Sequence, residues 1–181
     1  LAIPLKSLTP ECGLLLLVRS LRSDSQHLSE ELVKQFTLWS RDAQGTFNAQ
    51  QEASLRISYA DLAFRRGALP TARALYRRVA DAAEYRGSEM HLRAALGSVR
   101  VDMAAKNYSA ALEEIDKLIR LRNPDFRLRL HYAKAEVLME QENFAEALEE
   151  LEAVLRVEPK HPDALLLRGK SVIGSSTFSV N

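Results

Sequence analysis

The sequence has a single cysteine and no long apolar run, and each absence excludes a class of protein. The lone Cys12 excludes an internal disulfide and any zinc site built on several cysteines of one chain. The longest apolar run, Leu14 to Val18, is far shorter than the ~20 residues needed to span a bilayer. It also lacks the basic leader and the cleavage site of a signal peptide. We therefore expect no membrane span in this chain.

Net charge and turn residues are scarce as well. The 25 lysines and arginines nearly balance the 24 aspartates and glutamates, and the net charge of +1 gives no general attraction to nucleic acid or to an anionic membrane. Seven glycines and six prolines in 181 residues are too few for the turns of an all-β chain. A hydrophobic content of 46% still supplies a core. Because the chain starts at Leu1 rather than Met, we expect it to be a piece of a longer protein.

Helical periodicity runs through the sequence, and turn residues interrupt it at regular intervals. Thr9-Pro10-Glu11 and Pro162-Asp163 are typical helix starts, with proline in the first turn and an acid near the positive end of the helix dipole. The pattern predicts an all-α chain of about nine helices. Eight helices are expected at about 10–21, 29–41, 48–66, from 70 onward, 88–105, 108–122, 123–141 and 144–157. A last helix begins at 162 and fades after Gly169.

Three pairs of predicted helices share one internal pattern. Each second helix has a bulky residue, an alanine three positions later, a large residue four further on and an apolar residue three beyond that. The alanine is needed where two antiparallel helices cross most closely, because axes about 8–10 Å apart leave no room for a branched side chain. The alanines are 39 and 36 residues apart. The three sets are Leu69, Ala72, Tyr76 and Val79; Tyr108, Ala111, Ile115 and Leu118; and Phe144, Ala147, Leu151 and Val154.

This pattern resembles the tetratricopeptide repeat family, most strongly over residues 53–170. The best match runs from Leu130 to Pro159, where His131 and Lys134 depart from the usual aromatic residue and leucine. The resemblance implies a right-handed α-solenoid of antiparallel helix pairs. We expect a degenerate pair at 1–47, in which Trp39 is buried, and repeats at 48–87, 88–123 and 124–160. A partial repeat helix and tail then follow at 161–181, and the whole forms one continuous solenoid domain.

In this family the first helices of successive repeats line a concave groove that binds a protein or peptide partner. The face turned away from the second helix recurs at i, i+3 or i+4 and i+7. Phe64 and Tyr132 would offer apolar anchors there, or instead pack between neighbouring repeats. The groove positions predicted in this way are Ile57, Asp61, Phe64, Arg65, Arg93, Arg100, Arg129, Tyr132, Glu136 and Met139.

The charges at these positions argue against one subfamily. Repeat proteins that hold the C-terminal carboxylate of heat-shock chaperones use Lys, Asn and Arg in the groove, whereas Asp61 and Glu136 stand at matching positions here. Four arginines instead surround one turn between repeats, where an acidic segment of a partner is one interpretation and a solvated surface the other. They are Arg120, Arg122, Arg127 and Arg129.

No catalytic or metal-binding pattern is present in the sequence. The four histidines are scattered, and none has a second histidine three or four residues away. We expect no metal, cofactor or enzyme activity. The favoured hypothesis is a protein-interaction scaffold, with a ligand sensor and a structural spacer as alternatives. Leu165, Leu166 and Leu167 near the C-terminal edge also predict an apolar surface that more repeats would cover, or that forms a homodimer.

Overall fold

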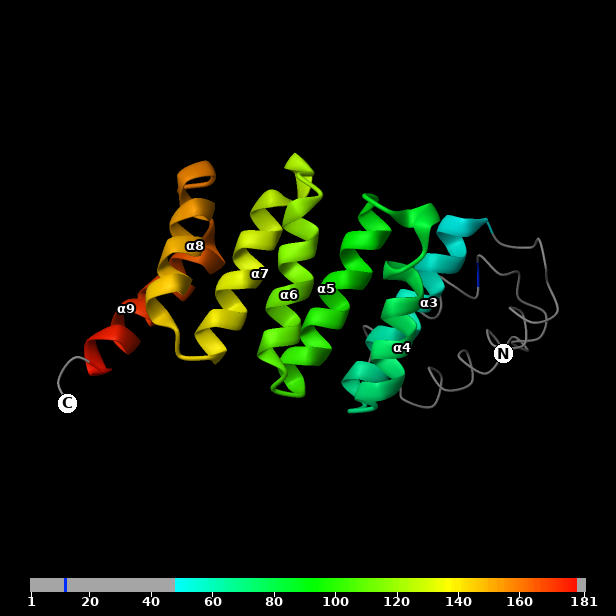
Figure 1. Cartoon of the computed structure of the whole chain (residues 1–181), viewed down its shortest axis with the longest axis horizontal. Helices are drawn as coiled ribbons and strands as arrows, with labels where there is room; N and C mark the ends of the chain where they lie inside the picture. Colours follow the sequence, from blue (N-terminus) through cyan, green and yellow to red (C-terminus); the bar gives the residue numbers. More distant parts are fainter. Residues whose placement is uncertain (1–11, 13–47, 179–181) are drawn as a thin grey trace, which may run out of the picture. The chain divides into compact units, whose positions relative to one another are not determined.

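The computed structural model describes residue 12 and residues 48–178, and this part of the chain is entirely helical, as expected (Figure 1). It contains seven α-helices, two short 3₁₀ helices and, within the described ranges, no strand. The two further helices expected near 10–21 and 29–41 lie outside the described residues, as does Trp39. The helices are α3 (Ala49–Arg65), α4 (Leu69–Ala80), η2 (Ala83–Tyr85), α5 (Glu89–Ala104), α6 (Tyr108–Arg120), η3 (Pro124–Phe126), α7 (Arg127–Glu140), α8 (Phe144–Val157) and α9 (Pro162–Phe178).

The chain divides into two compact units, and the first, Leu1–Arg86, contains a hairpin of α3 and α4. A capping box starts α3: the Asn48 side chain accepts from the Gln51 amide at 2.8 Å, and the Gln51 side chain accepts from the Asn48 amide at 3.0 Å. The Tyr85 hydroxyl donates to the Ala49 carbonyl at 2.7 Å. This bond attaches η2 to the first turn of α3.

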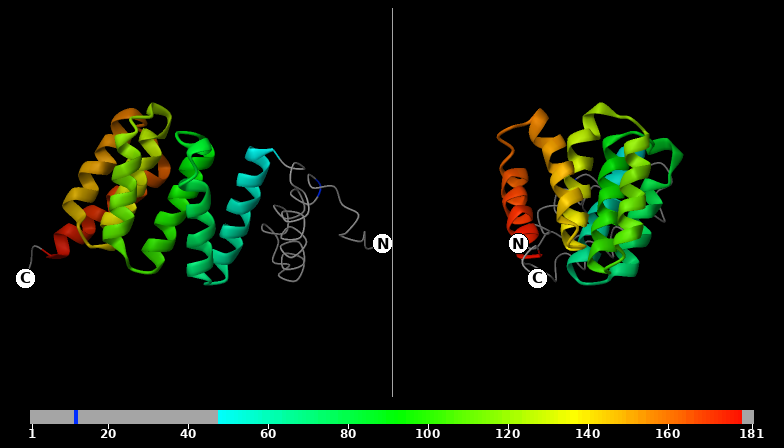
Figure 2. Two further views of the ribbon diagram at one scale, coloured as in Figure 1. Left: turned by 45° about the vertical axis from the view of Figure 1, so that its right-hand side comes forward. Right: turned by 60° about the vertical axis from the view of Figure 1, so that its left-hand side comes forward.

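The second unit, Gly87–Asn181, contains α5 to α9. Here α5 packs on α6, α6 on α7, α7 on α8 and α8 on α9. Figure 2 shows α7 and α8 lying side by side in this unit. Ser88 caps α5 by accepting from the His91 amide at 3.2 Å, as its sequence position predicts. Part of the core joins α7, α8 and α9 through Ala135, Leu151, Val154 and Ala164.

Three helical hairpins close with the same turn. A residue with positive φ follows the first helix each time, at 72° for Gly67, 59° for Lys106 and 60° for Glu142. The next amide then donates to a carbonyl five residues earlier, which is the Schellman closure of a helix C-terminus. Like the alanines, these turns lie 39 and 36 residues apart. The closing hydrogen bonds run from the amide of Ala68 to the carbonyl of Ala63 at 2.9 Å, from the amide of Asn107 to the carbonyl of Asp102 at 2.8 Å, and from the amide of Asn143 to the carbonyl of Leu138 at 2.9 Å.

Each second helix of a hairpin buries one narrow stripe, whose members are the last three of the four residues in each set of the repeat pattern, while the first residue of each set is half-buried. In α4 the buried residues are Ala72, Tyr76 and Val79; in α6 they are Ala111, Ile115 and Leu118; in α8 they are Ala147, Leu151 and Val154. The first helices α3, α5 and α7 bury residues on more than one side. In the second unit, α5 and α7 therefore each pack against their partner helix and against a further helix, as stacking of hairpins requires.

The expected end of the last helix is wrong. The sequence predicts that it fades after Gly169, but α9 continues to Phe178. Gly174 accounts for part of the difference, because a Cβ atom there would lie 2.6 Å from the Phe144 ring. At this position the glycine allows α9 to approach α8 closely rather than ending the helix.

None of the described helices is both long enough and apolar enough to cross a membrane.

Candidate partner-binding face

The predicted groove residues of the first unit lie on α3, and they differ in accessibility. Ile57 is 2% exposed and belongs to the core of this unit. Asp61 is half-buried and accepts a hydrogen bond from the Tyr76 hydroxyl of α4. Phe64 is half-buried and Arg65 is exposed. Arg65 and parts of Asp61 and Phe64 are therefore the surface that these four positions offer in this unit.

The predicted groove residues of the second unit lie on α5 and α7. Arg93, Arg100 and Arg129 are exposed, whereas Tyr132, Glu136 and Met139 are half-buried. We call these six residues the groove face. Helix α7 contacts both α5 and α9. The first helices of successive hairpins therefore run beside each other, and α7 is central.

An ion pair joins α5 to α7 at one end of the groove face. Arg129 donates through both terminal nitrogens to the Glu89 carboxylate, with a distance of 2.9 Å between Nη1 and Oε1. Such bidentate pairing fixes the relative orientation of the two groups. Both side chains are about half exposed, so the pair contributes only about 0–1 kcal/mol to stability.

The centre of the groove face is a cluster of polar groups around Glu136. Its carboxylate accepts a hydrogen bond from the Tyr132 hydroxyl. Burial raises the pKa of Glu136 above its usual range, and the negative charges of Asp163 and Glu140 raise it further. The hydrogen bond from Tyr132 and the positive charge of Arg100 offset only part of this rise.

Tyr132 connects this cluster to α9. Its ring stacks on the His161 ring, with centroids 5.6 Å apart and planes inclined by 20°. Burial, together with the charge of Glu136 and the hydrogen bond to it, raises the pKa of Tyr132 to about 12. Both of the uses that the sequence left open for Tyr132 are therefore compatible with the structure: its ring packs on His161, directly before the next first helix, and it remains partly accessible.

Met139 is held at the other end of the groove face. The Ser171 hydroxyl of α9 lies 2.8 Å from Met139 Sδ and 3.0 Å from the Leu167 carbonyl. Arg129 and Met139 each contact a neighbouring first helix, Tyr132 contacts the residue that precedes α9, and all three lie along one side of α7.

Sequence reasoning missed the partners that complete the groove face. Glu89 was missed although it lies 40 residues before Arg129, close to one repeat spacing, and carries the opposite charge. This combination of spacing and sign is the signal that could have found it. The other missed residues are Glu140, His161, Asp163 and Ser171.

Comparison with known families identifies the repeat. A family model described as tetratricopeptide repeat matches residues 19–88 and 132–172, which together make up more than half of the chain. The chain belongs to the tetratricopeptide repeat family. No curated protein and no solved structure matches it in the same comparisons. Tetratricopeptide repeats generally mediate protein–protein interactions, and they are typically non-catalytic.

The structure explains two departures from the usual tetratricopeptide residues. The Nζ atom of Lys134 in α7 lies 3.3 Å from Oδ1 of Asp116 in α6 and 3.0 Å from Oε1 of Glu150 in α8. The Nδ1 atom of His131 lies 2.6 Å from Oε2 of Glu150. Burial alone would lower the pKa of Lys134, but the hydrogen bonds and charges of Glu150 and Asp116 outweigh it and raise that pKa. A polar network joining three helices thus replaces an aromatic residue and a leucine.

In the part of the chain that the structure describes, no three histidine, cysteine, aspartate or glutamate side chains gather as a metal site would require.

Proposed function

We propose that this tetratricopeptide repeat chain is a non-catalytic scaffold that binds a segment of a partner protein on the groove face of its second unit. The face would be the concave side of the right-handed superhelix that the family resemblance implies. The repeat boundaries given above, and their union in one continuous solenoid, are part of this proposal. So is a role within a larger protein or assembly.

The observation that carries the proposal is the half-buried carboxylate of Glu136, beside which the acids Glu140 and Asp163 lie. A carboxylate in this state is stabilised by any cation that approaches it. Glu140 and Asp163 add negative charge at the same place and are exposed, so they are accessible to a partner. Tyr132 and Met139 supply half-buried apolar surface next to them. We therefore expect a partner segment that carries a lysine or arginine beside an apolar side chain.

The test is affinity capture from lysate with the whole chain, compared between two matched variants by quantitative mass spectrometry. Glu140→Lys with Asp163→Lys reverses two exposed charges at the groove face. Glu149→Lys with Glu152→Lys reverses two exposed charges on α8 and leaves the groove face intact. The proposal expects a partner that the wild type retains in stoichiometric amount, that the first variant loses and that the second keeps.

Two outcomes would contradict the proposal. Equal retention by both double variants would mean that the partner binds elsewhere. A small molecule that co-purifies with the chain, with no stoichiometric protein, would favour a ligand sensor instead. Circular dichroism should give the same helicity for all three proteins, because every substituted residue is exposed.

A further inference from the structure

A cavity of about 380 Å³ lies in the second unit, between the end of α6, η3 and the start of α7. It belongs to a different side of α7 from the groove face. Arg127, Leu130 and His131 line it, at i, i+3 and i+4, whereas Arg129, Tyr132 and Glu136 of the groove face follow a separate helical row. The remaining lining residues are Ile119, Arg122, Asn123 and Pro124.

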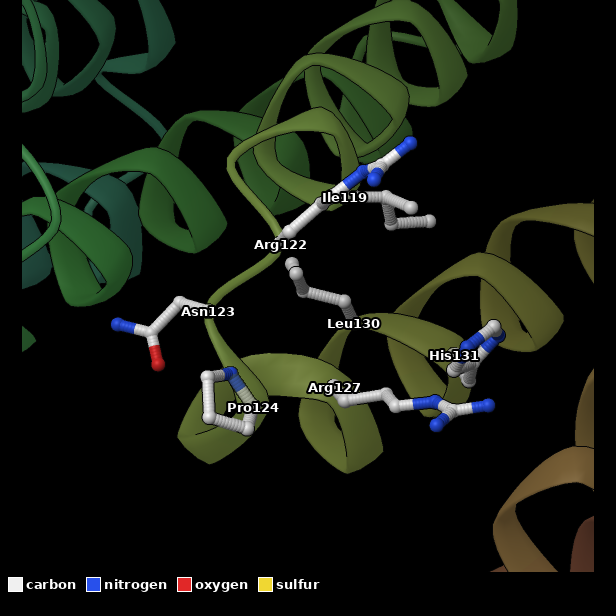
Figure 3. Close-up of a pocket in the computed structure, with 7 residues that line it drawn as sticks. All are labelled: Ile119, Arg122, Asn123, Pro124, Arg127, Leu130 and His131. Carbon is white, nitrogen blue, oxygen red and sulfur yellow. The ribbon is translucent and has the colours of Figure 1, made fainter.

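The lining combines apolar side chains with two guanidinium groups. In Figure 3, Arg122 approaches from the end of α6 and Arg127 from α7, with Ile119 and Leu130 between them, while Asn123 points away. Both arginines are exposed. Among the described residues neither guanidinium has an ion-pair partner, in contrast to Arg129, which is paired with Glu89.

Glu150 of α8, which contacts His131 of the cavity lining, is already paired. Glu150 is bound by both His131 and Lys134, so its carboxylate does not compensate the two arginines. The cavity therefore presents two uncompensated positive charges beside an apolar floor. A guanidinium group matches a carboxylate in a planar, bidentate geometry, and apolar surroundings strengthen such a bond.

We propose that this cavity is a second binding site, which takes an acidic segment of a partner protein in which a glutamate or aspartate stands beside an apolar side chain. Carboxylates of the segment bind Arg122 and Arg127, and the apolar side chain covers Ile119, Pro124 and Leu130. A volume of about 380 Å³ lies near the lower limit of ligand pockets and admits side chains rather than a folded element.

Two other classes of ligand fit less well. A free phosphate would satisfy the guanidinium groups but leave the apolar floor exposed to water. A single-stranded nucleic acid needs aromatic side chains on which its bases stack, and the cavity lining contains no phenylalanine, tyrosine or tryptophan, while its one histidine, His131, is paired with Glu150. A protein segment supplies both the charge and the apolar group.

The probe is a fluorescein-labelled peptide in which a leucine precedes two glutamates, between flexible glycine and serine ends. Its binding to the whole chain is followed by fluorescence anisotropy. A control peptide carries glutamines in place of the glutamates. The matched variants are Arg122→Gln, Arg127→Gln and Arg120→Gln, since Arg120 is an exposed arginine of the same cluster that does not line the cavity.

The proposal expects saturable binding of the acidic peptide, with the backbone amide signals of Arg122 and Arg127 shifting in heteronuclear NMR spectra. Arg122→Gln and Arg127→Gln should each weaken binding by about tenfold or more, as the loss of a hydrogen bond to a charged group does. Arg120→Gln should change it less than about twofold. The glutamine peptide should bind at least about tenfold more weakly than the acidic one.

Three results would overturn the proposal. The acidic peptide could fail to saturate at millimolar concentration while NMR spectra show all proteins folded. Arg120→Gln could weaken binding as much as Arg127→Gln, which would leave only general attraction between opposite charges. Finally, Arg127→Gln could abolish self-association of the chain without any peptide binding, which would make acidic residues of a second copy the occupant.

Discussion

Gly174 of α9 lies so close to Phe144 of α8 that a Cβ atom on this glycine would stand 2.6 Å from both Cε1 and Cζ of the ring. Gly169, one and a half turns earlier in the same helix, has nothing within 4 Å of the corresponding position. The two glycines thus share a helix and differ in what surrounds them. One is required by packing between helices, and the other is not.

This difference predicts opposite results for the same substitution. Gly169→Ala should stabilise the chain by about 0.5–1 kcal/mol, because alanine loses less conformational entropy in a helix than glycine. Gly174→Ala should lose this gain, since the methyl group displaces the Phe144 ring. Chemical denaturation of the two variants gives the comparison. An equal stabilisation by both would contradict the close approach of α8 and α9.

The buried alanines of the second helices predict a large effect of overpacking. Ala147 is fully buried where α8 crosses its neighbours, so Ala147→Leu should destabilise the chain by about 1–3 kcal/mol. Ala145 lies on the exposed side of the same helix, and Ala145→Leu should change stability by less than about 0.5 kcal/mol. Thermal melts of both variants measure the difference. If the two melts coincided, the register of the repeat would be incorrect.

These two tests concern the buried alanines and Gly174, and only the role of the alanines could be predicted from the sequence. Ala72, Ala111 and Ala147 were predictable because a recurring small residue has one physical explanation, the close crossing of paired helices. The role of Gly174 was not, because glycine is ambiguous: the same residue ends one helix and permits the close approach of another. The structure resolves the ambiguity through the position of the Phe144 ring.

The candidate site divides in the same way. The side of α7 that carries Tyr132 and Glu136 follows from helical periodicity and the family resemblance. The stacking of Tyr132 on His161 and the effect of Asp163 on Glu136 do not, because they depend on how α9 packs against α7. The cavity could not be predicted as a cavity, although its arginines belong to the cluster that the sequence contains.

A third prediction concerns the turns. Glu142 has φ of 60°, a left-handed conformation that costs a non-glycine residue about 1–2 kcal/mol. Glycine avoids this strain, but its greater loss of conformational entropy on folding offsets part of the gain. Glu142→Gly should therefore stabilise the chain by about 0.5–1 kcal/mol. Gln141→Gly is the control, because Gln141 has φ of −86° and no such strain to relieve. If urea denaturation gave Gln141→Gly a higher free energy of unfolding than Glu142→Gly, the left-handed turn at Glu142 would be incorrect.

The raised pKa of Glu136 predicts a pH dependence with a definite sign. Because its pKa is raised, the Glu136 carboxyl stays protonated in the folded state over a pH window above the usual glutamate range. In the same window, the carboxyl has already lost its proton in the unfolded state. The contribution of Glu136 to the free energy of unfolding therefore falls as pH rises through that window. Wild type should lose stability relative to Glu136→Gln between acidic and neutral pH. Urea denaturation of both proteins at a series of pH values measures this difference.

Tyr132→Phe provides an internal check on the same window. The hydroxyl of Tyr132 lowers the pKa of Glu136, so its removal should extend the loss of stability to higher pH. Stability of the wild type that stays constant or increases relative to Glu136→Gln would show that the carboxylate is not held in this environment.

The last prediction concerns the apolar stripe of α9. Ala164, Leu167 and Ser171 lie on the side that packs toward α7 and α8, whereas a second side exposes large apolar residues. Leu166 is 61% and Ile173 68% exposed, and Leu165 and Val172 lie on the same stripe. Stacked repeats normally end in a helix with a polar outer face, because an apolar outer face remains in contact with water.

A second copy of the chain can cover such a stripe, and we expect the isolated chain to form a dimer at high concentration through it. Leu166→Glu should abolish the dimer with little loss of helicity, because the substituted side chain is exposed in the monomer. Ala145→Glu adds the same charge at an exposed position of α8 and should leave the dimer intact. Sedimentation equilibrium with circular dichroism measures both properties. A strict monomer up to millimolar concentration, or a dimer that both variants lose equally, would mean that the stripe of α9 is not the contact surface.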